Sequence, residues 1–156
     1  MMAADAVRCM QRSTGGGGDV VSARYWRLVF YQSPIGRYRL NELTLYDAAD
    51  TDVSVGGVAS ASSQYKTWSP ARAFDKASPG SGDFMTDLSL PGEWLCYDAG
   101  ANVEVASIRI TGAGAADYTP YGFDLEYSDD NSAWAVAISI RDEAAWGYLE
   151  ERIFTL

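Results

Sequence analysis

The chain has 156 residues, of which 47% are hydrophobic and 21% charged, and its net charge at neutral pH is −9. This length fits one domain, and the composition is typical of a globular protein and excludes an intrinsically disordered one. The negative charge argues against nucleic acid and anionic membranes as partners, because both are bound mainly through Lys and Arg.

A polar leader, residues 1–22, is predicted to precede the domain. It has no apolar core of the kind found in signal peptides, and no apolar run in the chain is long enough to span a membrane. We therefore expect synthesis in a cytoplasm without export by the usual route. Four glycines at 15–18 are typical of a flexible hinge. Residues 1–18 are thus either a disordered tail or a peptide that docks on a partner.

Residues 23–156 have the pattern of short β-strands. In the first run Trp26, Leu28 and Phe30 alternate with polar or less apolar residues, which predicts one buried face. Comparable runs occupy 42–45, 94–97, 103–110, 123–127, 134–140 and 152–156. Segments rich in Gly, Pro, Asn, Asp and Ser separate the runs and indicate turns. Within 103–110 the apolar face switches, which indicates either a β-bulge or an error in treating these residues as one strand. No segment has a convincing helical period, so we expect an all-β sandwich or barrel.

Seven segments, taken in order, resemble the signature of discoidin-like domains. They are YWRL at 25–28, NELTLYD at 41–47, ASASS at 59–63, ARAFD at 71–75, EWLCYDAG at 93–100, VASIRI at 105–110 and PYGFDLEYSDD at 120–130. The resemblance covers residues 23–156 and implies a galactose-binding-like jelly-roll β-sandwich. In many secreted discoidin domains the hairpin with the first two motifs closes the domain, whereas here it opens it. That order resembles a rearranged form found in tail-fibre and other virion proteins of bacterial viruses.

The resemblance also implies a structural calcium ion, with Asp75 and Glu42 as side-chain ligands. Calcium takes six to eight oxygen ligands, mostly carboxylates and carbonyls. The chain departs from the family at the next two positions, where Lys76 and Ala77 replace a Gly-Asn pair and weaken the site. The alternative is that Asp75 caps a loop and that Glu42 is a solvated strand residue.

A ligand site in discoidin-like domains, where there is one, lies in the loops at one end of the sandwich. Aromatic rings there stack on sugars, and polar groups hold the hydroxyls. The matching loop residues of this chain are Tyr65, Trp68, Arg72, Tyr118 and Tyr121. The same loops could instead contact a protein, or their rings could be packed lids.

Enzymatic functions are disfavoured by the residues present. The chain has no histidine, which excludes Ser-His and Cys-His nucleophile schemes and His-based metal sites. Asp124 and Glu126 are paired carboxylates, but their spacing places both on the exposed face of one strand, where we expect them to be solvated. Cys9 and Cys96 do not imply a disulfide framework, and Cys96 is expected in the core.

Two functions therefore remain. The first is a non-enzymatic structural or attachment module of a bacterial virus, in a tail fibre, tail tip or capsid surface, with residues 1–18 docking on other virion proteins. Such a protein leaves the host by lysis and becomes extracellular without a signal peptide. The second is a stand-alone carbohydrate-binding lectin or adhesin. A virion module could itself bind host-cell glycans, and a homo-oligomer is compatible with either function.

Overall fold

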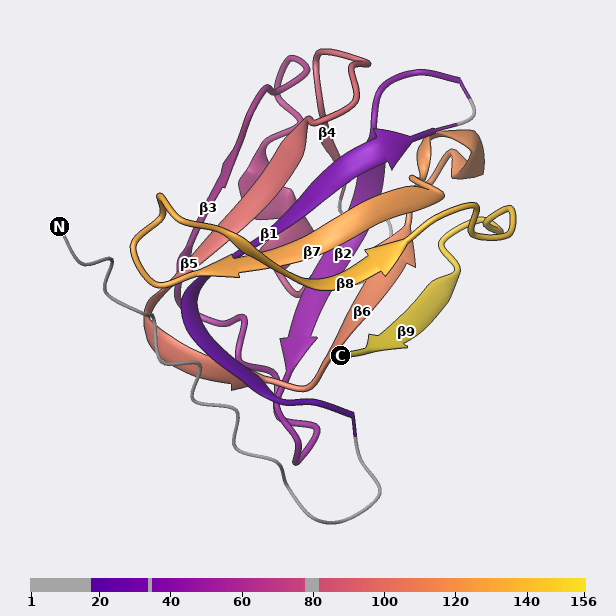
Figure 1. The fold of residues 1–156 in the computed structure, drawn as a ribbon. Helices are drawn as coiled ribbons and strands as arrows, with labels where there is room; N and C mark the ends of the chain where they lie inside the picture. Colours follow the sequence, from indigo (N-terminus) through magenta and orange to yellow (C-terminus); the bar gives the residue numbers. More distant parts are fainter. Residues whose placement is uncertain (1–17, 34, 78–81) are drawn as a thin grey trace, which may run out of the picture.

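The computed structural model describes residues 18–33, 35–77 and 82–156, so most of the predicted leader lies outside the described residues. Two antiparallel sheets face each other (Figure 1). The five-stranded sheet has the order β3 (Val58–Ala61), β5 (Trp94–Val105), β1 (Val21–Gln32), β7 (Gly122–Ser128) and β8 (Ala135–Ile140). The four-stranded sheet has the order β4 (Phe84–Met85), β2 (Arg39–Tyr46), β6 (Ser107–Gly112) and β9 (Glu151–Thr155). The predicted all-β sandwich is confirmed.

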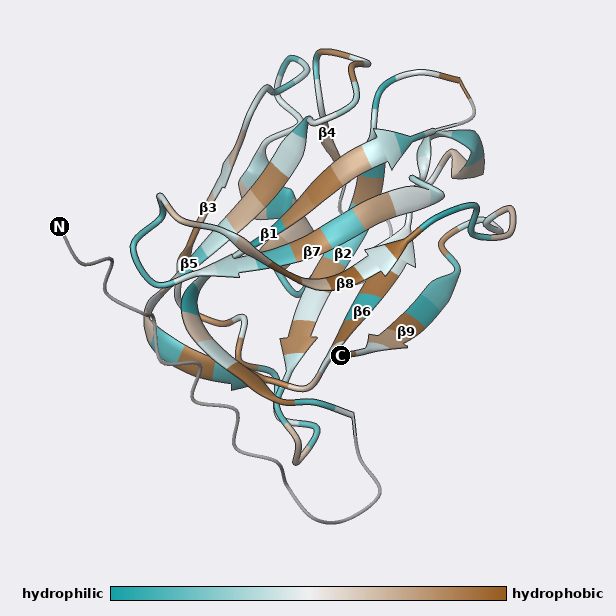
Figure 2. Ribbon diagram, viewed as in Figure 1, coloured by the Kyte–Doolittle hydropathy of each residue, from teal (hydrophilic) through white to brown (hydrophobic). Residues whose placement is uncertain are grey.

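The core lies between the two sheets. Strand β1 is central, pairing with β5 on one side and β7 on the other, and its residues Trp26, Leu28 and Phe30 are fully buried, as predicted. Leu43 and Leu45 of β2 face them from the second sheet and belong to the same cluster. Figure 2 shows the hydrophobic stretches on the strands and paler or hydrophilic colours along most loops. Burial of this alternating apolar face is the main force that holds the sandwich together.

The expected strand at 103–110 is in fact two strands. Val105 ends β5, Ser107 begins β6, and the chain passes from one sheet to the other at Ala106. Its amide donates to the carbonyl of Tyr46 at 2.8 Å, and its carbonyl accepts from Leu156 at 2.9 Å. The switch of apolar face therefore marks a change of sheet, because the inward side of the new strand must turn toward the shared core.

Short 3-10 helices and loops gather at the end of the sandwich where β1 ends (Figure 1). The helices are η1 (Pro70–Phe74) and η2 (Ala116–Tyr118), which strand periodicity did not predict. Gly18 lies at the opposite end, against Leu156 and Thr155. No helix in the described ranges is long and apolar enough to cross a membrane.

Candidate functional site

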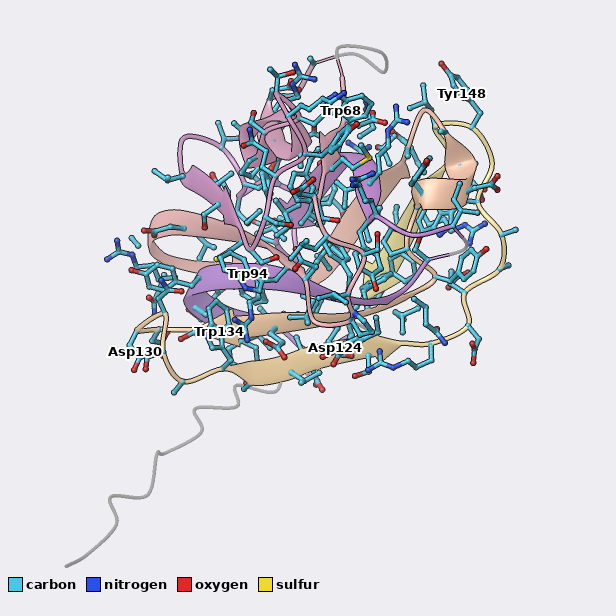
Figure 3. All side chains as sticks on the ribbon, turned by 90° about the horizontal axis from the view of Figure 1, so that it is seen from above. Trp68, Trp94, Asp124, Asp130, Trp134 and Tyr148 are labelled. Atoms are coloured by element: carbon cyan, nitrogen blue, oxygen red, sulfur yellow. The ribbon has the colours of Figure 1, made fainter. Side chains whose placement is uncertain are left out.

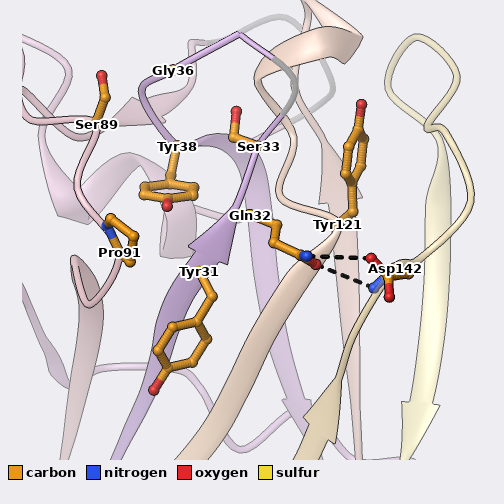
Figure 4. A pocket seen from close by; sticks show the side chains of 9 residues that line it. All are labelled: Tyr31, Gln32, Ser33, Gly36, Tyr38, Ser89, Pro91, Tyr121 and Asp142. Atoms are coloured by element: carbon orange, nitrogen blue, oxygen red, sulfur yellow. Dashed lines mark hydrogen bonds between the residues drawn. The ribbon is translucent and has the colours of Figure 1, made fainter.

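A hollow of about 440 Å³ opens at the loop end of the sandwich (Figure 4), and we call it the loop-end pocket. It is bordered by the end of β1, by the loops before β2 and β5, by the segment after η2 and by the loop after β8. Its lining residues are Tyr31, Gln32, Ser33, Gly36, Tyr38, Ser89, Pro91, Tyr121 and Asp142. Five separate segments thus contribute to one small surface that combines aromatic rings with hydroxyl, amide and carboxylate groups.

Hydrogen bonds hold the walls of the loop-end pocket in place. The side-chain amide of Gln32 donates to the Asp142 carboxylate at 3.2 Å, and the Asp142 backbone amide donates back to Gln32 Oε1 at 3.2 Å (Figure 4). The backbone amide of Tyr121 donates to the carbonyl of Gln32 at 3.0 Å. These bonds join three of the five segments, so the pocket is formed before any ligand arrives.

Two of the three tyrosines that line the pocket are held in place by contacts with neighbouring side chains. Tyr38 is buried and stacks on Phe30, with ring centroids 5.1 Å apart, and burial raises the pKa of its phenol. Tyr31 lies under the guanidinium of Arg141, 4.6 Å from the ring centroid. Burial, together with the negative charges of Asp124 and Glu126, raises the pKa of Tyr31. Both phenols therefore stay protonated at neutral pH, and the Tyr31 hydroxyl donates its hydrogen bond to the Asp124 carboxylate.

Three of the five predicted loop residues lie at two separate places. Tyr121 lines the loop-end pocket, whereas Tyr65 and Trp68 form a second aromatic pair, with ring centroids 6.5 Å apart. Arginine guanidinium groups already cover one face of each ring, Arg37 over Tyr65 at 4.2 Å and Arg39 over Trp68 at 4.4 Å. Cation–π contacts of this kind stabilise a loop, and they leave less free ring surface for stacking a sugar.

The remaining two predicted residues do not line the pocket. Arg72 belongs to η1, and its guanidinium lies close to Gly82. Tyr118 is half-buried at the end of η2. Among the five predicted residues, the pocket thus includes Tyr121 alone.

Sequence reasoning missed the polar half of the pocket. Tyr31 and Gln32 end the first strand run, Ser89 precedes a Pro-Gly turn, and Asp142 follows the last-but-one strand. Tyr31, Gln32 and Asp142 lie at strand ends, and strand ends of antiparallel neighbours meet at the same edge of a sheet. That shared edge was a usable signal, but the pairing of β1 with β7 and of β7 with β8 had to be known first.

A buried ionic cluster supports the same end of the molecule. Asp83, just before β4, accepts a hydrogen bond from Asn41 at 2.9 Å and another from the backbone amide of Gly114 at 2.9 Å, and it pairs with Arg39. Because Arg39 also lies over Trp68, this cluster fixes the position of the second aromatic pair.

Of the two residues expected to hold calcium, Glu42 is in contact with a lysine ammonium group. Glu42 is buried on β2, and Lys76 Nζ lies 3.2 Å from Glu42 Oε1 and 3.1 Å from Asp52 Oδ2. Burial raises the pKa of Glu42 to about 7, against the opposing effect of Lys76. The part of the alternative that made Glu42 a solvated strand residue is therefore wrong. Asp75 is exposed, and one of its carboxylate oxygens accepts from the amide of Ala77 at 2.9 Å, as expected of a loop cap.

The expectation that Asp124 and Glu126 are solvated is also wrong. Asp124 is 7% exposed and its carboxylate lies 2.8 Å from the Arg141 guanidinium, while Glu126 accepts from Arg27 at 2.6 Å. Arg27 in turn lies 4.0 Å from the Trp134 ring centroid. Figure 3 shows Trp134 and Asp124 on one side of the molecule and Trp68 and Tyr148 on the opposite side. The outer face of β7 is thus covered by arginine side chains.

Comparison with family models decides the family. The model of the F5/8 type C domain matches residues 58–153, which is more than half of the chain. The chain belongs to the F5/8 type C domain family. No curated protein and no solved structure gave a match. The F5/8 type C, or discoidin, domain is in general a non-catalytic module that binds carbohydrate or another ligand.

The segment matched to the F5/8 type C domain does not include β1 and β2. These strands nevertheless complete the fold, because β1 lies between β5 and β7 and β2 lies between β4 and β6. The match and the described structure together agree with a discoidin sandwich. The hairpin expected of the first two motifs is not formed, because β1 and β2 lie in different sheets and pair with other strands.

Proposed function

We propose that this discoidin domain is a carbohydrate-binding module that holds a neutral sugar in the loop-end pocket. The observation that carries the proposal is the joining of three tyrosines with Gln32, Ser89 and Asp142 around one hollow. Aromatic rings stack on the apolar faces of sugars, and the polar groups can exchange hydrogen bonds with sugar hydroxyls. A volume of about 440 Å³ falls within the range of about 300–1,000 Å³ typical of small-molecule sites.

The charge of the pocket supports a neutral ligand. None of the described residues that line it is basic, and Asp142 contributes a carboxylate. A sulfated or sialylated glycan, or a phospholipid headgroup, would bring negative charge to this carboxylate, and the nearby guanidinium of Arg141 is already paired with Asp124. The net charge of −9 adds a long-range repulsion of the same sign.

The experiment is binding of the purified full chain to a glycan array, followed by titration of the best neutral hexose. Tyr121→Ala removes an aromatic wall and should weaken binding about tenfold or more, in line with the contribution of one stacked ring. Tyr148→Ala is the matched control, because Tyr148 is an exposed tyrosine outside the pocket. Binding that tolerates Tyr121→Ala, or that prefers anionic glycans, would contradict the proposal.

The virion setting is a separate part of the proposal. It is supported by the order of the sequence motifs, in which YWRL and NELTLYD precede the others, and by the glycine run at 15–18, which suits a tether between a docking peptide and a projecting module. In that setting the pocket would hold a sugar of the host-cell surface. Deleting residues 1–18 should abolish incorporation into particles and leave sugar binding by the domain intact. Incorporation of the truncated chain would reject the docking role.

A further inference from the structure

The family resemblance implies a calcium ion beside Glu42 and Asp75, and the residues present do not fit one. Calcium requires six to eight oxygens at about 2.3–2.6 Å. Within the described part of the chain, no group of three acidic, His or Cys side chains is arranged to hold a metal ion. The place next to Glu42 is taken by the ammonium group of Lys76, whose positive charge would repel a divalent cation.

The geometry around Lys76 is that of a bound cation. Its Nζ lies 3.2 Å from Glu42 Oε1 and 3.1 Å from Asp52 Oδ2, and it donates to Ser54 Oγ at 2.9 Å. Of these three oxygen neighbours, Ser54 Oγ accepts a hydrogen bond, whereas Glu42 and Asp52 contact the ammonium group as ion pairs, and the Glu42 contact lacks hydrogen-bond geometry. We call this arrangement of Glu42, Asp52 and Ser54 around Lys76 the lysine cage.

The oxygens of the lysine cage are themselves held from outside. Ser54 donates to Asp52 Oδ1 through both its backbone amide, at 2.8 Å, and its hydroxyl, at 2.7 Å. The same hydroxyl accepts from the backbone amide of Leu45 on β2 at 3.1 Å. The cage therefore connects three segments, namely β2, the loop that follows it and the loop after η1.

The backbone of Lys76 indicates that these contacts stabilise the loop. Its φ is +55°, a left-handed conformation that costs a residue with a side chain free energy unless its surroundings hold it there. Lys66 is the other lysine of the chain, and it has a similar φ of +50°. Within the described residues Lys66 has no carboxylate partner, and its amine lies over the Tyr65 ring. The two lysines thus differ in their partners while sharing a backbone conformation.

We propose that the Lys76 ammonium group is a built-in cation that does the structural work of a metal ion, so that this discoidin domain is stable without calcium. Residues 75–77, directly after η1, are held by a covalently attached charge, which cannot dissociate and cannot be removed by a chelator. The inference is independent of the sugar pocket, which none of the residues of the lysine cage lines.

The first test compares thermal unfolding of the full chain in calcium chloride and in EDTA, using Lys76→Gln and the matched control Lys66→Gln. The wild-type midpoint should be the same in both solutions. Lys76→Gln should lower it by roughly 5 °C or more, because a buried carboxylate loses its partner, while Lys66→Gln should have little effect. A wild-type midpoint that rises in calcium or falls in EDTA would overturn the proposal, as would equal midpoints for the two variants.

The second test does not require a folded variant. An amine-reactive acetylating reagent is added to the native wild-type chain, and the two lysine-containing peptides are followed by mass spectrometry. Lys66 should react several-fold faster than Lys76, since the Lys76 amine must leave three oxygen partners before it can attack. Equal rates for the two lysines would show that the cage does not hold the ammonium group and would overturn the inference.

Discussion

The side-chain amide of Asn41 donates a hydrogen bond to Asp83 at 2.9 Å across the buried edge between β2 and the segment before β4. Asp83 also binds Arg39 and the amide of Gly114, and its side chain is 4% exposed. One carboxylate therefore joins three segments at the loop end of the domain.

Asp83→Ala should lower the free energy of unfolding by about 3 kcal/mol or more, because Arg39 and Asn41 lose a buried partner. Asp87→Ala is the control, since Asp87 is 53% exposed and lies 3.6 Å from Arg37. An exposed pair of this kind contributes less than about 1 kcal/mol. Denaturant unfolding measures both variants, and equal losses would contradict the assignment of Asp83 as a buried connector.

The raised pKa of Glu42 predicts that the stability of the domain depends on pH. Its pKa in the folded chain is about 7, above the ordinary value of 4.5, so the folded state holds the proton more tightly than the unfolded state. The stabilisation from this proton is complete below the unfolded pKa of 4.5 and is lost as the pH rises through 7. The free energy of unfolding of the wild type, relative to Glu42→Gln, should therefore fall across this range by up to roughly 3 kcal/mol.

Comparison with the Gln variant isolates Glu42 from the other acidic groups, which titrate in both proteins. Chemical denaturation at a series of pH values gives the difference directly. A difference that is constant with pH, or that grows as the pH rises, would mean that Glu42 is not held in a buried environment.

Sugar binding in the loop-end pocket should depend little on salt. The described lining residues include no basic side chain, so hydrogen bonds and ring stacking carry the affinity. Raising the salt concentration to about 0.5 M screens exposed charges almost fully but leaves these contacts intact. Titration calorimetry at low and high salt should give dissociation constants within a factor of about two. A steep loss of affinity would indicate an ionic ligand.

Truncation of the core should cost far more than truncation of a sheet edge. Leu28 is fully buried at the centre of β1, and Leu28→Ala should destabilise the domain by about 2–5 kcal/mol. Val136, on the edge strand β8, is 50% exposed, and Val136→Ala should cost less than about 1 kcal/mol. Thermal unfolding of the two variants distinguishes these cases, and similar losses would argue against β1 as the central strand.

The sequence was sufficient for the strand pattern and insufficient for much of the site. The alternation of Trp26, Leu28 and Phe30 predicted a buried face correctly, because burial on a strand follows a period of two. Tyr31 and Asp142 were not predicted as partners, because their meeting depends on the order of strands within the sheet. Local patterns contain no information about that order.

The carboxylates show a second reason why the surroundings of some residues could not be predicted from the sequence. The sequence predicts a solvated Asp124 because no residue near it in the chain would cover it. In the fold, however, Arg141, directly after β8, and Tyr31 of β1 contact its carboxylate. The sequence indicates that Lys76 weakens a calcium site, but it does not predict the contacts of Lys76 with Asp52 and Ser54, because these depend on the fold.

Gly18 lies so close to Leu156 that a β-carbon at Gly18 would stand 2.3 Å from the Leu156 carbonyl oxygen. A short linker could therefore join residue 18 to residue 156, and new ends could be opened in an exposed loop without disturbing either sheet. Circular permutation of the gene would then move β1 and β2 from the start of the domain to its close while every strand kept its neighbours. The same arrangement of strands can thus be reached by chains that begin at different strands.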